Sequence, residues 1–468
     1  MISVTINGKP RTLRGETPLP QLLHSLKLDV RLIAVAVNGD VIPKNQYKAV
    51  VLRAGDVVEI VRMVGGGSLE ARSSKLEART PPHRTSSLES RASSVGAEVV
   101  VAGAGIIGCA IAYELSRRGV SCLLLDSRRA GMAATNAAAG ILAPLAEFRR
   151  PDALVHLGLA SLRLYPEWVE RLREQAPEVD VEFARNGVLR VAFDGEEMAE
   201  LRAGLRYQAE LGMELIELDG ATVREVEPRL SPRIVGGVLC PEEGQVSNQM
   251  FTIALSRAAR KRGVRIIESC PALGFRARDG RVVAVRTPQG EFACDRLVLA
   301  AGPWTRPLAR KLGVDVPTRP MRGQMLAMGG MVTPIHAVVW GARGYLVPRA
   351  NGLVFAGATV EDVGFRLRTT KAGLAQVRRA ACELVPQLRH ASEHFSWVGL
   401  RPGSPDGLPI MGPLPGWENV TVATGHFRNG ILLAPITGQL IAQAILDGRP
   451  GEALAPFDPG RFTLSNTS

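Results

Sequence analysis

The sequence predicts a chain of mixed α/β and α+β class, with a small domain at residues 1–66, a flexible linker at 67–96 and a large region at 97–468. Three observations predict this division. The first segment follows the order strand, strand, helix, strand, strand. The second is rich in Ser, Arg and Glu and poor in large apolar residues. Beyond it, strands and helices alternate as they do in α/β proteins. Within this region, the segments 188–193, 282–287 and 353–356 look like strands of a second, more β-rich lobe.

Length and composition agree with a folded chain of several domains. The chain has 468 residues, enough for about three domains at about 150 residues each. Hydrophobic residues make up 46% and charged residues 22%, which excludes wholesale disorder. The net charge of +12 is spread along the chain and only 5% of residues are aromatic, so we expect no nucleic-acid surface. The positive excess instead favours anionic small molecules as ligands.

Cysteine usage and the N-terminus predict a cytoplasmic protein. The six cysteines stand alone, without a CxxC pair, which is typical of reduced thiols. The N-terminus alternates as a strand does, so we expect no signal peptide. The most apolar long stretch, 133–146, is too short to cross a bilayer, so we expect no membrane association. The scattered His and Cys residues have no metal-ligand spacing, and no metal is expected.

The small domain has strong local signals. A hairpin is predicted over 3–14, turning at Asn7-Gly8. Leucines spaced along 19–26 give one apolar helical face. Strands at 32–37 and 56–64 complete the domain.

The last of these strands runs into Gly65 and Gly66, a tail without side chains that suits a narrow binding site. The linker that follows has no core to bury, so we interpret it as flexible. A marginal helix at 69–79 is the alternative.

A glycine-rich turn at the start of the large region predicts a Rossmann-type dinucleotide site. A buried-type strand at 98–102 leads into Gly103, Gly105 and Gly108, and a helix follows at 109–118. The three glycines permit a tight turn, a close approach of backbone to a pyrophosphate, and close helix–strand packing. The helix N-terminus then offers N–H donors to the phosphates. A glycine-rich loop without a ligand is the alternative.

Asp126 ends the next strand and is placed to accept hydrogen bonds from ribose hydroxyls. This fingerprint does not separate NAD from FAD. Two later segments favour a flavin. A buried strand at 295–302 ends in small residues at Gly302, and a strand at 420–423 runs into a glycine-rich loop and a helix from Ile431. The second helix N-terminus is suited to a polarised ring system.

Arg401 is the main candidate for binding a substrate, because it lies in an apolar, Gly/Pro-rich stretch and needs an anionic partner. Asp406 is a possible internal partner, so a structural ion pair is the alternative. Tyr345 could donate to the same carboxylate or could be a core residue. Arg428 could line a pocket or lie on the surface. His426 is expected to order its loop rather than to act as a base.

Stretches of the large region resemble the ThiO-type glycine oxidases of the D-amino-acid oxidase and sarcosine oxidase superfamily. The matching stretches are 103–108, 137–142, 344–349, 399–403 and 425–435. The resemblance implies an FAD-binding domain with an inserted, β-rich substrate domain. The FAD-binding parts would be about 97–180, 245–310 and 396–468, and the substrate-binding parts about 181–244 and 311–395.

The resemblance also implies roles for single residues. Arg401 would hold the substrate carboxylate, Tyr345 would assist, and Arg428 would lie beside the flavin. The residues implied to bind FAD, without a covalent link, are Gly103, Gly105, Ile106, Ile107, Gly108, Asp126, Ser127, Thr135, Ala139, Gly140, Ile141, Ala272, Gly302, His426, Phe427, Arg428, Asn429, Gly430, Ile431 and Leu432. Three residues depart from the family's pattern: Ala134, Asn136 and Arg343. These departures bear on substrate preference and flavin contacts, not on the reaction.

The implied reaction is oxidation of glycine to its imine, with hydride transfer to flavin N5 and reduction of O2 to hydrogen peroxide. No protein base is needed, because the amine binds deprotonated. The product would supply the thiazole ring of thiamine, and relatives suggest a tetramer. Three alternatives stay open: an oxidase or dehydrogenase of sarcosine or small D-amino acids, an NAD-linked dehydrogenase, and a scaffold protein with an inert flavin lobe.

Residues 1–66 resemble the ThiS sulfur carriers, which have the ubiquitin-like β-grasp fold. Such carriers are adenylated at a terminal glycine carboxylate and converted to a thiocarboxylate. The implied partners are an adenylating enzyme and thiazole synthase. Here Gly66 is followed by Gly67, so the intact chain has no free carboxylate at this point. Cleavage in the linker, a vestigial domain and a docking module all remain open.

Overall fold

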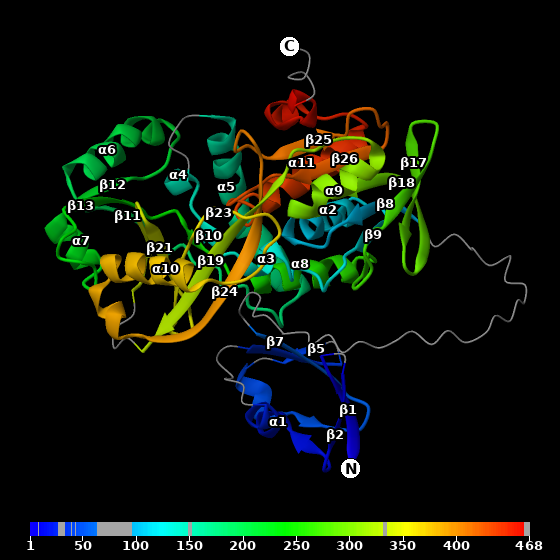
Figure 1. The fold of residues 1–468 in the computed structure, drawn as a ribbon, viewed down its shortest axis with the longest axis horizontal. Helices are drawn as coiled ribbons and strands as arrows, with labels where there is room; N and C mark the ends of the chain where they lie inside the picture. The colour runs from blue at the N-terminus through cyan, green and yellow to red at the C-terminus, as the bar shows by residue number, and fades with distance from the viewer. Residues whose placement is uncertain are drawn as a thin grey trace, which may run out of the picture.

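The computed structural model describes residues 1–7, 9–26, 33–38, 40–42, 44–62, 96–147, 152–330 and 335–462. These residues form the predicted mixture of a small α+β unit and a large α/β region (Figure 1). Gly65, Gly66 and the predicted linker up to residue 95 lie outside the described residues.

The small unit is one five-stranded sheet with a helix against it. In spatial order its strands are β2 (Lys9–Leu13), β1 (Ile2–Ile6), β7 (Val57–Arg62), β4 (Ile33–Val37) and β5 (Asp40–Ile42). Helix α1 (Leu19–Ser25) buries Leu19, Leu22 and Leu23, as its leucine spacing predicts. A short pair, β3 (Thr17–Pro18) and β6 (Val51–Leu52), completes the unit.

The first large sheet carries the predicted strand–turn–helix. Its strands are β15 (Arg265–Ile267), β9 (Cys122–Leu125), β8 (Ala97–Ala102), β18 (Gly290–Leu299), β17 (Arg281–Thr287), β16 (Gly274–Arg278), β26 (Val420–Thr424) and β25 (Ile410–Pro413). The strands β15, β9, β8, β18 and β26 run parallel. Parallel strands end at the same edge, so the turns after β8, β18 and β26 meet there.

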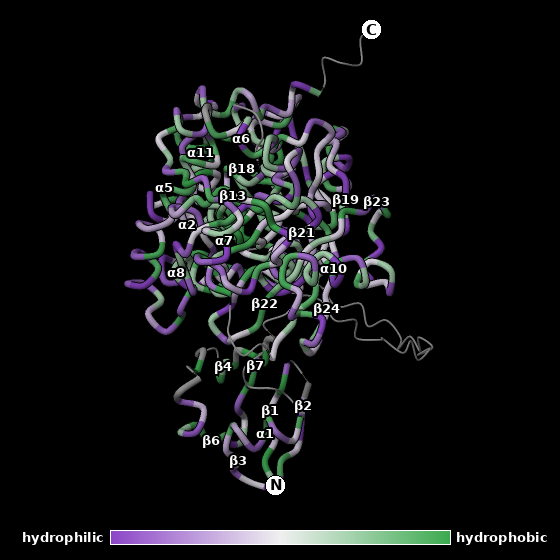
Figure 2. Tube along the Cα trace, turned by 90° about the vertical axis from the view of Figure 1, so that its left-hand side faces the viewer, coloured by the Kyte–Doolittle hydropathy of each residue, from purple (hydrophilic) through white to green (hydrophobic). Residues whose placement is uncertain are grey.

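Helices cover this sheet and bury its apolar strands. They are α2 (Ile106–Arg117), α5 (Ala153–Gln175), α8 (Asn248–Lys261), α9 (Thr305–Ala309) and α11 (Ala434–Asp447). Figure 2 shows more hydrophobic residues towards the middle of the large region and more hydrophilic residues at its outer edge. The largest apolar cluster joins one face of the sheet to α2, α5, α8 and α11.

In the described part of the chain, the second large sheet has nine strands. They are β12 (Ile216–Asp219), β13 (Gly236–Cys240), β11 (Val188–Ala192), β20 (Val338–Gly341), β21 (Gly344–Pro348), β22 (Val354–Gly357), β19 (Arg319–Gly329), β23 (Glu361–Asp362) and β24 (Ser392–Gly403). Its helices are α6 (Gly195–Glu210), α7 (Gly220–Val226) and α10 (Lys371–Leu384). Two short helices, α3 (Ala134–Ala137) and α4 (Pro144–Glu147), and the strand pair β10 (Ile141–Leu142) and β14 (Gly244–Gln245) complete the described elements that concern the site.

One strand prediction was wrong in its placement. The segment 282–287 is a strand, as predicted, but it does not belong to the second, β-rich lobe. It lies in β17, which pairs with β18, the neighbour of β8 in the first large sheet. Residue alternation identifies a strand but does not determine which sheet it joins.

Candidate functional site

The turn between β8 and α2 is shaped for a close approach of backbone. Gly103 has φ +115°, and a Cβ there would collide with the Ala300 carbonyl at the end of β18. A Cβ on Gly108 would collide with the Gly103 carbonyl, so this glycine lets α2 pack against the turn. The N-terminal N–H of Ile106 donates to the Thr135 hydroxyl at 3.0 Å.

Asp126 holds the same turn from the end of β9. Its carboxylate accepts the backbone N–H of Ala104 at 2.7 Å and that of Arg128 at 2.8 Å. Burial raises its pKa, and these two hydrogen bonds act in the opposite direction. The carboxylate also lines the cavity described next, where an acceptor for ribose hydroxyls is expected.

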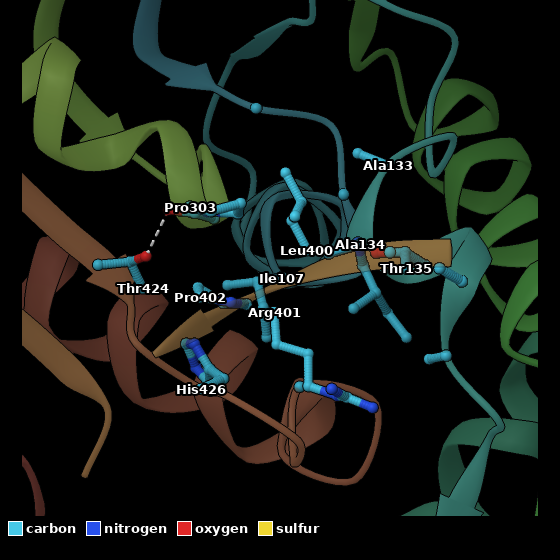
Figure 3. A pocket seen from close by; sticks show the side chains of 18 of the residues that line it. Ile107, Ala133, Ala134, Thr135, Pro303, Leu400, Arg401, Pro402, Thr424 and His426 are labelled. Atoms are coloured by element: carbon cyan, nitrogen blue, oxygen red, sulfur yellow. Dashed lines mark hydrogen bonds between the residues drawn. The ribbon is translucent and has the colours of Figure 1, made fainter. Parts of the chain in front are cut away.

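A cavity of about 390 Å³ opens at this edge of the sheet. It is lined by residues from the β8–α2 turn, α3, the ends of β9, β18 and β24, and the loop after β26 (Figure 3). The predicted site residues that line it are Gly103, Gly105, Ile106, Ile107, Asp126, Ser127, Thr135, Ala139, Gly140, Ile141, Ala272, Gly302, Tyr345, Arg401, His426, Phe427, Arg428, Asn429, Gly430 and Ile431. Gly108 and Leu432 do not line it. The glycine-rich turn, the N-terminal end of α2 that lines the cavity and an acid at the end of β9 fit an FAD dinucleotide.

Arg401 lies at one wall of this cavity, near the end of β24. Its guanidinium donates to the Thr359 carbonyl at 3.1 Å, and a Cβ on the facing Gly323 would collide with it. Burial lowers the pKa of Arg401 from its ordinary value, and the neighbouring Arg428 acts in the same direction. Among the described residues Arg401 takes part in no ion pair. Asp406, the alternative partner, instead binds Arg461 at 2.8 Å.

Tyr345 lies beside Arg401 on the cavity wall, and its hydroxyl donates to the Met325 sulfur at 3.8 Å. Burial raises the pKa of this tyrosine, against the effect of Arg401 and Arg428. Gly357 makes room for the ring, since a Cβ there would stand 2.6 Å from the phenol carbon and oxygen. The structure therefore brings together a guanidinium and a phenol that could hold one carboxylate.

Sequence reasoning missed Glu147, the last residue of α4. Its carboxylate accepts a hydrogen bond from Arg428 at 3.1 Å, and both residues line the cavity. Burial raises the pKa of Glu147, while Arg428 and Arg401 oppose this rise. The Arg428 guanidinium also lies 5.4 Å from the centre of the Trp340 ring. Arg428 is thus paired with an acid at the cavity wall and is not a free surface charge.

The loop after β26 is fixed by buried polar contacts. His426 Nε2 lies 3.1 Å from the Thr437 hydroxyl, and burial lowers the pKa of His426 to about 3, so this ring is neutral. Tyr165 donates to the Ile431 carbonyl at 2.5 Å, and Ser161 donates to that of Leu432 at 2.6 Å. These contacts agree with a loop-ordering role for His426.

The residues that depart from the family's pattern are placed as follows. Ala134 lines the cavity, and Asn136 is buried beside it. Arg343 does not line the cavity, but forms an ion pair with Glu383 at 2.5 Å from the exposed turn between β20 and β21. Within the described ranges, no helix is long and apolar enough to span a membrane, and no cluster of three or more His, Cys, Asp or Glu residues could hold a metal ion.

Comparisons with known proteins agree with this geometry. The profile of the family described as FAD dependent oxidoreductase matches residues 98–444, and the ThiS family profile matches residues 4–67. A bifunctional ThiO/ThiG protein of Trichormus variabilis is 37% identical over 370 residues, which cover 78% of this chain and 55% of the relative. The chain thus spans about half the length of this relative.

Glycine oxidases match over nearly their whole length. That of Geobacillus kaustophilus is 32% identical over 362 residues, covering 77% of this chain and 96% of the relative. The crystal structure of glycine oxidase from this organism has a TM-score of 0.75 at 31% identity, covering 78% of this chain and 98% of that one. These matches confirm both family resemblances and FAD as the cofactor. The chain belongs to the FAD-dependent oxidoreductase family and carries a ThiS-family segment at its N-terminus.

Proposed function

We propose that the large region oxidises glycine to its imine and passes the electrons to O2, giving hydrogen peroxide. Bound FAD supplies the two-electron acceptor for this chemistry. The observation that carries the proposal is the pairing of Arg401 with Tyr345 on the wall of the cavity that fits FAD. The names of the glycine oxidase relatives support the choice of substrate.

Arg401 and Tyr345 would position the substrate by its carboxylate. The guanidinium is partly buried, is held by the Thr359 carbonyl and forms no ion pair with an acid among the described residues, so a substrate carboxylate would balance its charge. When the carboxylate is held, the orientation of the α-carbon is fixed as well. Orientation of the substrate can supply a large part of the rate enhancement.

No side chain is assigned as a base. His426 is neutral, buried and hydrogen-bonded to Thr437 through Nε2, and burial raises the pKa of Tyr345, which lies beside Arg401. We therefore propose that glycine binds with its amine already deprotonated. Sarcosine or small D-amino acids as the preferred substrate are the alternative.

A visible spectrum of the purified protein before and after anaerobic glycine tests this proposal. We expect a yellow protein that bleaches with glycine and regains its colour with air while peroxide forms. Sarcosine and D-alanine in parallel rank the alternatives. A colourless protein would favour the NAD-linked dehydrogenase, and a yellow protein that no amine bleaches would favour the scaffold.

We also propose that the ThiS-family segment is a sulfur carrier of the thiamine pathway, and that the imine serves the thiazole ring in the same pathway. The ThiS match and the ThiO/ThiG name of the relatives support this. An adenylating enzyme and thiazole synthase would be its partners, in the cytoplasm, and the oxidase would be a tetramer. Mass spectrometry tests whether the chain is cut after Gly66, and light scattering measures the oligomer.

A further inference from the structure

Three charged side chains meet at the wall of the cavity that holds Tyr345. Arg428 is bound on one side by the Glu147 carboxylate at 3.1 Å and packs on the other against the ring of Trp340. Arg401 is bound by a backbone carbonyl, which carries no net charge. Two further cationic side chains line the cavity and contact other residues. Arg128 stacks on the ring of Trp304, and Lys311 donates to a backbone carbonyl. Arg401, Arg428 and Glu147 together leave one net positive charge.

A buried polar network holds α4, the short helix that carries Glu147. The Glu243 carboxylate accepts the Leu145 N–H at 2.7 Å. Arg190 and Gln208 donate to the Leu145 carbonyl at 3.2 and 3.3 Å, and Arg190 also donates to the Gln208 side-chain oxygen at 3.0 Å. All three network side chains are buried, with exposed fractions of 0% to 6%. Such polar groups are costly to bury without partners, so the network specifies where α4, and with it Glu147, lies.

We infer that Glu147 is a specificity-determining residue that neutralises Arg428 and restricts the site to substrates with a single negative charge. This inference rests on the proposed amine oxidation at the same site. A second carboxylate on the substrate would have to displace Glu147 from Arg428 or lie beside a like charge. Both cost free energy at this partly buried wall, so Glu147 should discriminate against dicarboxylates.

Two ligands of the same shape separate charge from size. Malonate carries two carboxylates, and malonamate replaces one of them with an amide. Isothermal calorimetry of the FAD-loaded protein at pH 8 gives the dissociation constant of each, without turnover. We expect the wild type to bind malonamate more tightly than malonate. In Glu147→Gln, the ratio of the two dissociation constants should shift towards malonate by about tenfold or more, because Arg428 becomes free for the second carboxylate.

Glu178→Gln is the matched control, since it removes the acid of another arginine pair, with Arg257 at 2.5 Å, outside the cavity. Its malonate-to-malonamate ratio should equal that of the wild type. Glu147→Ala removes the same charge with less volume and should shift the ratio as Glu147→Gln does. An unchanged ratio in folded variants would overturn the inference, as would loss of folded protein in both, which would make Glu147 structural.

The outcome is separable from the proposed function. If glycine is not oxidised but the ratio shifts, the charge selectivity stands and the assigned reaction fails. If glycine is oxidised and the ratio does not shift, only the role of Glu147 fails.

Discussion

The guanidinium of Arg401 lies directly against Gly323 on the neighbouring strand β19, where a Cβ atom would collide with it. The same strand pair places Arg401 opposite Met321, so the position of the guanidinium depends on the packing of β19 against β24. The absence of a side chain at residue 323 is therefore a requirement of the proposed carboxylate site.

Gly323→Ala should displace Arg401 and weaken glycine turnover while the fold persists. Displacement of a positioning group by about 1 Å can cost roughly a hundredfold in rate, so we expect kcat/KM for glycine to fall by about 10- to 100-fold. Steady-state peroxide assays measure this. Gly195→Ala is the control, because a Cβ there meets no neighbour within 4 Å. Equal kinetics in the two variants would contradict the assignment.

Much of the cofactor end could be predicted from the sequence because its signals are local. The glycines at 103, 105 and 108 and Asp126 follow a fixed spacing on one strand–turn–helix–strand unit, and the structure places them as that spacing requires. Arg401 was found because a charge in an apolar stretch needs a partner.

Other features depend on contacts between distant segments. Glu147 belongs to no motif, and only the fold brings it to Arg428. Gly323 looks like any glycine in a strand until β24 is placed beside it. The same limit explains the wrong placement of 282–287, because the alternation of residues in a strand does not show which sheet the strand joins. Asp406 lies close to Arg401 in sequence, yet its partner is Arg461.

Glu361→Gln should weaken the contacts that hold Arg401 in place and change the stability of the fold in acid. Partial burial alone would raise the pKa of Glu361, but hydrogen bonds from Arg322, Thr359 and Gln324 lower it from 4.5 to about 2. A lowered carboxyl pKa stabilises the fold above about pH 4.5 and loses that effect as the pH falls towards 2.

The wild type should therefore lose Tm more steeply than Glu361→Gln between pH 4.5 and the lowest pH at which it stays folded. At neutral pH the variant should have a raised KM for glycine, because Glu361 also accepts from Thr359, whose carbonyl holds Arg401. Parallel Tm curves for the two proteins would refute the linkage.

Glu243→Gln should change the pH dependence of stability in the opposite sense. Burial raises the pKa of Glu243 from 4.5 to about 7, against hydrogen bonds from the backbone at Leu145 and the charge of Arg190. A carboxyl with a raised pKa stabilises the fold fully below 4.5, and this effect is lost as the pH rises to about 7. The Tm of the wild type should fall relative to Glu243→Gln over this interval. A difference in Tm that does not vary with pH would count against the buried acid.

Acid precipitation should release the flavin from the protein. Among the described residues no cysteine lines the cavity, so no thiol is placed for a cysteinyl link to FAD. The yellow colour should appear in the supernatant, measured by its absorbance, and the pellet should be colourless. A yellow pellet after washing would mean that the cofactor is covalently attached.

Arg401→Ala should separate substrate binding from cofactor binding. Removing one partner of a buried charge pair costs about 2–5 kcal/mol, which corresponds to a rise in KM for glycine of roughly 30-fold or more. FAD should remain bound, because the β8–α2 turn and Asp126 that would hold its dinucleotide part are untouched. Arg401→Lys keeps the charge but loses the two-pronged geometry, so its KM should lie between those of the wild type and the alanine variant. Saturation of Arg401→Ala by glycine at wild-type concentrations, with the flavin spectrum intact, would show that the carboxylate is held elsewhere, and Arg428 would then be the first residue to test.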